Sequence, residues 1–274
     1  MPDAILDKRP DGTALITLNR PESLNALGGD MVPLLGRYLD ECEEDRSVRS
    51  IALTGAGRGF CAGGDVKNMA AGTAPGAGDK SQPNLARMLT ESIEDLRKRQ
   101  NSSALRLATI PKPTVALVNG PAAGAGLGLA LSCDLRVCSD RANFRTAFKN
   151  IALSGDFGGS YFLQRLVGYG RALELYYTSA VIDAENALSL GIANLMVPHD
   201  SLLEEGLSFC AELASGPTSA YGRMKSNFNF SATARLSDAL DHEAFNMRLG
   251  RNAPDFSEGT RSFVEKRAPR FTGE

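Results

Sequence analysis

The sequence has few of the residues on which several common chemistries depend. It contains only two histidines, and neither lies near a nucleophile motif, which argues against a serine–histidine–aspartate triad. Its cysteines form no C-x-x-C pair, so we expect reduced thiols rather than a disulfide framework or a zinc site. The five cysteines are Cys42, Cys61, Cys133, Cys138 and Cys210.

Long apolar runs and a strong net charge are also missing. No run of about 18 apolar residues and no basic-then-apolar leader is present. The net charge of −2 gives no electrostatic reason to propose binding to nucleic acid or a membrane surface. With 43% apolar and 23% charged residues, the composition is that of an ordinary globular protein. We therefore expect a soluble, cytoplasmic protein without nucleic-acid or membrane partners.

Glycine, in contrast, is concentrated at particular turns. Residues 54–65 read TGAGRGFCAGGD and follow the apolar run at 50–54 directly. Glycine permits positive φ and lets a ligand approach the main chain closely. No Gly-Lys-Ser/Thr follows, which excludes a P-loop. The turn could hold a developing negative charge on its backbone N–H groups, or it could be a plain strand-to-helix connection.

A second glycine-rich turn, at 119–128, follows an apolar strand at 114–118, and a third lies at 154–159. If the first two turns face one cleft, each can offer a backbone N–H group to the same oxygen. That arrangement is an oxyanion hole, which stabilises the negative charge that forms during acyl chemistry.

The remaining pattern predicts an α/β fold. Strands are expected at 4–8, 13–19, 51–54, 114–118, 135–138 and 193–197. Helices are expected at 29–44, 85–107, from about 125 to 133, at 161–167, 171–179 and 184–190, and from 201 onward with a break near 216–217. Residues 70–84 are interpreted as a loop and not as an interdomain linker, because the pattern resumes unchanged after them.

The motifs together resemble the enoyl-CoA hydratase/isomerase (crotonase) superfamily. They read NRPESLNAL at 19–27, GFCAGGD at 59–65 and VNGPAAGAG at 118–126, and segments 191–194, 217–225 and 259–266 continue the likeness. The resemblance implies an α/β spiral of ββα turns over residues 1–200. It also implies a C-terminal helical region, 201–274, that helps to form a homotrimer or a dimer of trimers and belongs to the same structural unit. The implied substrate is an acyl-CoA thioester, with no cofactor besides the CoA that it carries.

The resemblance also assigns binding roles. The two oxyanion donors would be the backbone N–H groups of Gly64 and Ala125. Ala125 stands where the family usually has glycine, but the donor is a main-chain group, so alanine need not remove it. Lys67 could meet a CoA phosphate or could be an ordinary solvated lysine. The segments that would contact CoA comprise Ser23, Leu24, Ala62, Gly64, Asp65, Val66 and Lys67.

The sequence departs from the family's hydratases, which use two glutamates to activate and hold water. Gly128 and Phe148 stand at those two positions, and neither carries a titratable proton. Asp156 instead resembles the single catalytic aspartate of some enoyl-CoA isomerases. We expect Phe148, Phe157 and Tyr161 to line the acyl pocket around Asp156. Alternatively, Asp156 could be a turn residue that bonds its own backbone.

Three functions follow as hypotheses. The first is an isomerase in which Asp156 moves a proton across an enolate held by the two turns. The second is a hydratase that uses Asp156 and an ordered water. The third is a CoA-thioester binding protein without activity. Two other carboxylates have structural interpretations: Asp65 would cap a helix, and Asp134 would anchor the turn between a helix and a strand.

Overall fold

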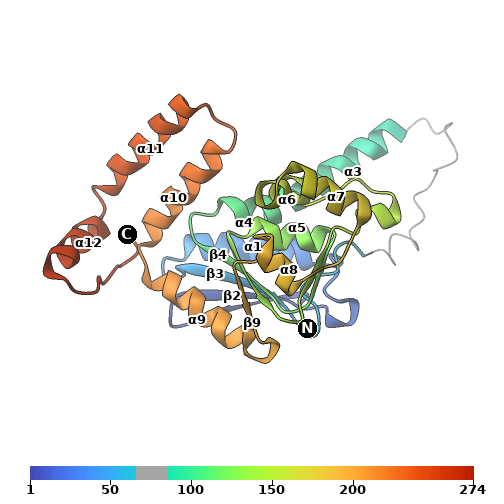
Figure 1. The fold of residues 1–274 in the computed structure, drawn as a ribbon, viewed down its shortest axis with the longest axis horizontal. Helices are drawn as coiled ribbons and strands as arrows, with labels where there is room; N and C mark the ends of the chain where they lie inside the picture. Colours follow the sequence, from blue (N-terminus) through green and yellow to red (C-terminus); the bar gives the residue numbers. More distant parts are fainter. Residues whose placement is uncertain (66–84) are drawn as a thin grey trace.

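The computed structural model, shown in Figure 1, describes residues 1–65 and 85–274. Its central feature is a six-stranded sheet in the order β1-β2-β3-β4-β6-β9. Strands β1 (Ala4–Lys8) and β2 (Thr13–Leu18) pair antiparallel. The remaining pairs are parallel, which follows from the long crossovers between them. The remaining strands of this sheet are β3 (Ser50–Gly55), β4 (Thr114–Val118), β6 (Leu135–Ser139) and β9 (Leu195–Val197).

Both faces of this sheet are buried, which explains why its central strands β3 and β4 are largely apolar. In β4, Ala116 and Val118 point into the larger core cluster, while Val115 and Leu117 point into the smaller one. Figure 1 shows helix α9 (Leu202–Ser215) on one side of the sheet. On the other side lie α1 (Met31–Glu44), α4 (Arg106–Thr109) and α5 (Ala125–Ser132).

A second sheet, which the sequence did not predict, joins β5 (Pro121–Ala123), β7 (Asn143–Arg145) and β8 (Ile182–Asp183). These strands contain three residues or fewer, too few for a period-two pattern to be recognised. The chain runs β4-β5-α5 and then β6-β7-α6, where α6 is Gly159–Val167. The predicted repetition of ββα units is therefore confirmed.

Two stretches of predicted helix are interrupted. The helix expected at 85–107 is α3 (Leu85–Gln100), a π-helical turn at Asn101–Leu105 and then α4. The C-terminal stretch breaks at 216–217, as predicted, and again near 232–235 and 251–253. The remaining helices are α7 (Tyr169–Thr178), α8 (Ala184–Ser189), α10 (Thr218–Ser231), α11 (Leu236–Gly250) and α12 (Pro254–Glu265), with short 3₁₀ turns at Pro21–Ser23, Phe148–Ile151 and His199–Ser201.

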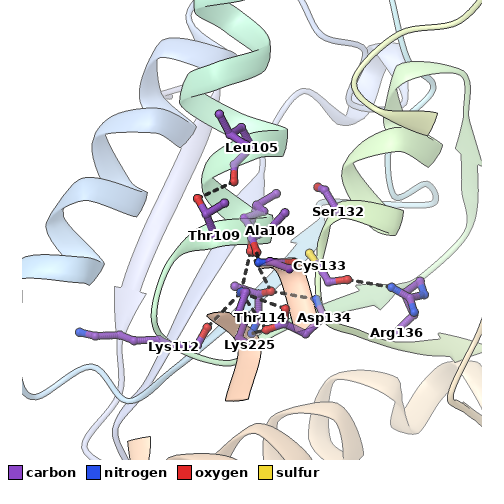
Figure 2. Close-up of polar contacts among 12 residues, drawn as sticks. Leu105, Ala108, Thr109, Lys112, Thr114, Ser132, Cys133, Asp134, Arg136 and Lys225 are labelled. Carbon is purple, nitrogen blue, oxygen red and sulfur yellow. Dashed lines mark hydrogen bonds and ion pairs between the residues drawn. The ribbon is translucent and has the colours of Figure 1, made fainter. Parts of the chain in front are cut away.

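Helices α10 to α12 extend away from the sheet (Figure 1), and α10 is tied to the core by a half-buried lysine. Figure 2 shows Lys225 directed at Asp134, with 2.9 Å between Nζ and Oδ2, and its Nζ also donates to the Leu107 carbonyl. Asp134 accepts the Thr114 N–H at 2.9 Å, so its predicted role as a turn anchor is confirmed. Burial raises the pKa of Asp134 and lowers the pKa of Lys225, against the opposite effect that each charge has on the other.

The cysteines are packing residues. All five thiols are free and buried. Burial raises the pKa of Cys61, inside the first glycine turn, to about 12, so it is a neutral thiol at physiological pH. Among the described helices, none has the length and apolar character needed to cross a membrane.

Candidate active site

The first glycine turn is held in place by two asparagines from the sequence motifs. Asn25 donates its side-chain amide to the carbonyls of Ala56 and Gly59, at 2.9 and 2.8 Å. Asn119, directly after β4, donates to the Gly55 carbonyl at 2.9 Å. The backbone hydrogen bonds of the sheet stop where the strands end. The two asparagine side chains bond the carbonyls beyond that point, so this glycine-rich loop keeps a defined shape.

The first and second glycine turns lie against each other. The Ala123 N–H donates to the Cys61 carbonyl at 2.9 Å. Gly63 has φ +90°, and a Cβ atom there would lie 2.6 Å from the Ala123 oxygen and 3.1 Å from the Ala125 nitrogen. A Cβ atom on Gly126 would overlap the Cys61 carbonyl. Glycine is thus required at both positions because the two backbones approach so closely.

This contact places the predicted donors, the N–H groups of Gly64 and Ala125, on neighbouring turns. Helix α5 begins at Ala125, after Gly124 with φ +53° and ψ −123°. Neither the Gly64 N–H nor the Ala125 N–H donates a hydrogen bond to another described residue. Both groups can therefore serve an external acceptor, and the positive end of the α5 dipole favours a negative one.

Asp156 is half-buried in the third glycine turn, and among the described residues only one of its two carboxylate oxygens accepts hydrogen bonds. Oδ1 accepts the Gln100 side-chain amide at 2.6 Å and the Phe157 N–H at 2.7 Å. Oδ2 accepts no hydrogen bond from the part of the chain that is described. The bond to Phe157 is the turn-type contact of the alternative interpretation, and it leaves Oδ2 available for chemistry.

The absence of a side chain at Gly128 allows the turn that carries Asp156 to pack on helix α5. A Cβ atom on Gly128 would lie 2.7 Å from the backbone carbonyl oxygen of Phe157 and 3.1 Å from that of Asp156. Because Gly128 is three residues after Ala125 on α5, the turn that carries Asp156 packs on the first turn of that helix. A glutamate at position 128 would displace the Asp156 turn, so the glycine at 128 and the position of Asp156 are physically linked.

The predicted acyl-pocket aromatics lie in different surroundings. Phe148 is 7% exposed, and its ring lies beside Gly124, 3.8 Å from the position a Cβ atom would take there. Phe157 is 2% exposed. Tyr161 is 41% exposed, and its ring packs against the Arg165 guanidinium at 3.5 Å. The pocket role of all three residues remains a prediction.

The sequence interpretation missed Tyr176 of α7. Its ring stacks on Phe148, with centroids 6.1 Å apart and planes 9° apart. Gly155 and Gly159, on either side of Asp156, leave room for the Tyr176 hydroxyl. A Cβ atom on Gly159 would lie 2.7 Å from that hydroxyl oxygen. Burial, and then the negative charge of Asp156, raise the pKa of Tyr176 to about 12. Its helical spacing from buried Ala172 was a signal that could have identified it.

The segments predicted to contact CoA also meet. The Ala62 N–H donates to the Leu24 carbonyl at 2.9 Å, so the strip that includes Ser23 lies beside the first glycine turn. Asp65 pairs with Arg20 at 3.5 Å. The helix that Asp65 was expected to cap, like Val66 and Lys67, falls outside the described residues.

Comparisons with known proteins agree with this architecture. A family model described as enoyl-CoA hydratase/isomerase matches residues 8–274. The chain is 36% identical to 1,2-epoxyphenylacetyl-CoA isomerase of Escherichia coli (strain K12), with both chains covered completely. It is 33% identical to 4-chlorobenzoyl coenzyme A dehalogenase-1 of Arthrobacter sp., over 93% of this chain and 88% of the relative. A solved enoyl-CoA hydratase from Polaromonas sp. JS666 matches with a TM-score of 0.86 and 30% identity, over 98% of this chain and 99% of that one.

The match extends over nearly the whole sequence and the whole fold, so the family and the crotonase-like ββα architecture expected from the motifs are confirmed. The chain therefore belongs to the enoyl-CoA hydratase/isomerase (crotonase) family and is an enzyme of that family.

Proposed function

We propose that this enzyme moves a carbon–carbon double bond in an enoyl-CoA thioester, with Asp156 as its single acid–base group. One observation carries the proposal: the Asp156 turn packs on the first turn of α5, with one carboxylate oxygen held by two donors and the other without a donor among the described residues. Gly128 and Phe148 leave no carboxylate at the two positions where the family's hydratases have glutamate.

The proposed reaction uses the two glycine turns and Asp156 together. The thioester oxygen accepts the N–H groups of Gly64 and Ala125, which stabilise the negative charge of an enolate. Asp156 removes a proton from the α-carbon of a 3-enoyl thioester, and the electron pair spreads over a dienolate. The same proton returns to the γ-carbon, which leaves the double bond in conjugation with the thioester. A base of this type contributes about 10²–10⁴-fold in rate.

This scheme consumes no water, needs no second carboxylate and uses no cofactor besides the CoA of the substrate. Ser23, Leu24, Ala62 and Asp65 are proposed as the wall that contacts CoA, because the Leu24–Ala62 hydrogen bond joins those segments. Val66 and Lys67 are proposed to continue that wall, with Lys67 near a CoA phosphate. Phe148, Phe157 and Tyr161 are proposed as acyl-pocket residues.

The reaction class can be tested with two substrates. We expect a 3-enoyl-CoA to gain the absorbance of a conjugated thioester when the protein is added. Loss of that absorbance from crotonyl-CoA, without reaction of the 3-enoyl compound, would instead indicate hydration. If neither compound reacts but acyl-CoA esters bind tightly, the protein is an acyl-CoA binding protein and the proposal is wrong.

The C-terminal helices are proposed to assemble the chain into a homotrimer or a dimer of trimers. Apolar side chains there are exposed far beyond what an isolated monomer usually shows, with Phe263 at 84% and Val264 at 79%. A groove of about 880 Å³ runs between α10, α11 and α12. Its apolar lining includes Met224, Met247, Phe256, Phe263 and Phe271.

Replacing Phe263 and Val264 together by aspartate should therefore reduce the mass of the assembly to that of a monomer, measured by light scattering after size exclusion. Burying a charge in an apolar interface is unfavourable unless it is paired. The control is Leu203→Asp on α9, which is also exposed but lies outside this surface. A monomeric parent protein, or an assembly that survives the double change, would exclude this interface.

A further inference from the structure

Helix α3 ends at the active site, and its last two residues make the contacts. Every residue from 90 to 98 is exposed, while Arg99 and Gln100 are half-buried. Gln100 donates its side-chain amide to Asp156 Oδ1 at 2.6 Å. Arg99 donates its guanidinium to the Leu27 carbonyl at 3.1 Å, and the Leu27 N–H in turn donates to the Gly63 carbonyl at 2.7 Å. Gln100 thus contacts the turn that carries Asp156, and the adjacent Arg99 contacts the segment beside the first glycine turn.

The backbone changes its winding directly after these two residues. Asn101–Leu105 form a π-helical turn, a type that is frequent at functional sites. The Ser103 hydroxyl donates to the Arg99 carbonyl at 2.6 Å, and the Ser102 hydroxyl donates to the same oxygen at 3.2 Å. These hydrogen bonds satisfy the Arg99 carbonyl at the point where the regular α-helical hydrogen-bond pattern changes.

Helix α1 fixes the position of this π-helical turn. A Cβ atom on Gly36 of α1 would lie 3.0 Å from Ser102 Cβ and 3.1 Å from the Ser102 oxygen, so the two segments pack backbone to backbone. Such close packing permits little movement. The direction in which Gln100 leaves the helix is therefore set by the fold.

We propose that Gln100 is a positioning residue that fixes the carboxylate of Asp156 through Oδ1 and leaves Oδ2 for the substrate proton; the inference rests on the proposed role of Asp156. Two donors on one oxygen restrict the side chain to a single orientation, as a reacting group requires. Glutamine does not titrate, so Gln100 keeps its N–H donor at every pH.

The test compares Gln100→Ala with Lys98→Ala, an exposed position on the same turn of α3. For Gln100→Ala we expect kcat on a 3-enoyl-CoA to fall roughly 10- to 100-fold, the range for losing a hydrogen bond to a charged group. Affinity for the acyl-CoA ester should stay unchanged, so that the loss falls on kcat and not on substrate binding. Lys98→Ala should alter none of these quantities.

Gln100→Glu provides a second variant of nearly equal shape. An ionised glutamate has no proton to donate to Asp156 Oδ1 and its charge repels that carboxylate, so kcat should fall at least as far as in Gln100→Ala. If both variants fold and retain the parent kcat, while Asp156→Asn is inactive, the positioning role is refuted and the role of Asp156 survives. A loss of acyl-CoA affinity that accounts for the whole loss of activity would likewise refute it. An active Asp156→Asn variant would instead overturn the proposed function itself.

Discussion

Asp156→Asn is expected to lower kcat for a 3-enoyl-CoA by about 10²–10⁴-fold, the range that a positioned acid–base group contributes. The change is nearly isosteric. The asparagine carbonyl can still accept the Gln100 amide and the Phe157 N–H that now hold Oδ1. What is lost is the second, basic oxygen, because an amide nitrogen stands in its place. The glycine turns are untouched, so binding of an acyl-CoA ester should remain at the parent level.

Two measurements separate this expectation from a general loss of structure. Conversion of the 3-enoyl-CoA should stop, and so should exchange of the substrate α-proton with deuterated solvent, since both need the same base. Asp238→Asn, on an exposed turn of α11, makes the same chemical change away from the site and should leave both rates intact. Retention of turnover in Asp156→Asn would assign the proton transfer to another group.

The parts of the site that could be predicted from the sequence are those marked by local sequence patterns. Glycine turns that follow apolar strands can be recognised because a buried parallel strand is apolar on both faces, and β3 and β4 have that character. The strands of the second sheet are too short for such a signal, although β5 leads the chain from β4 into α5. Their positions depend on contacts between segments far apart in the sequence.

The missed residues show where local signals end. Tyr161 and Tyr176 lie on successive helices, α6 and α7, and the sequence does not say which ring turns toward Phe148. The structure stacks Tyr176 there and packs Tyr161 on Arg165. Gln100 reaches Asp156 from the end of α3, where a π-helical turn changes the phase of the helix. A regular period carried from 85 to 107 could not place that side chain.

Ala125→Pro should lower kcat by about 10²–10³-fold, roughly 3–4 kcal/mol, by deleting one of the two proposed oxyanion donors. Main-chain donors are difficult to remove, but this one lies at the first residue of a helix. Proline is favoured there, because its fixed φ suits the helix and no helical partner is lost. The residue before it is Gly124, which has no Cβ atom to collide with the proline ring.

The matched control is Ala125→Gly, which keeps the N–H group and changes only a methyl group. We expect its kcat to stay close to that of the parent protein, so the difference between the two variants isolates the donor from the side chain. Circular dichroism and the thermal midpoint establish that both variants are folded. A proline variant that is folded and fully active would show that the Ala125 N–H does not hold the thioester oxygen. The charge of the enolate would then have to be stabilised by the first glycine turn alone, through the Gly64 N–H group.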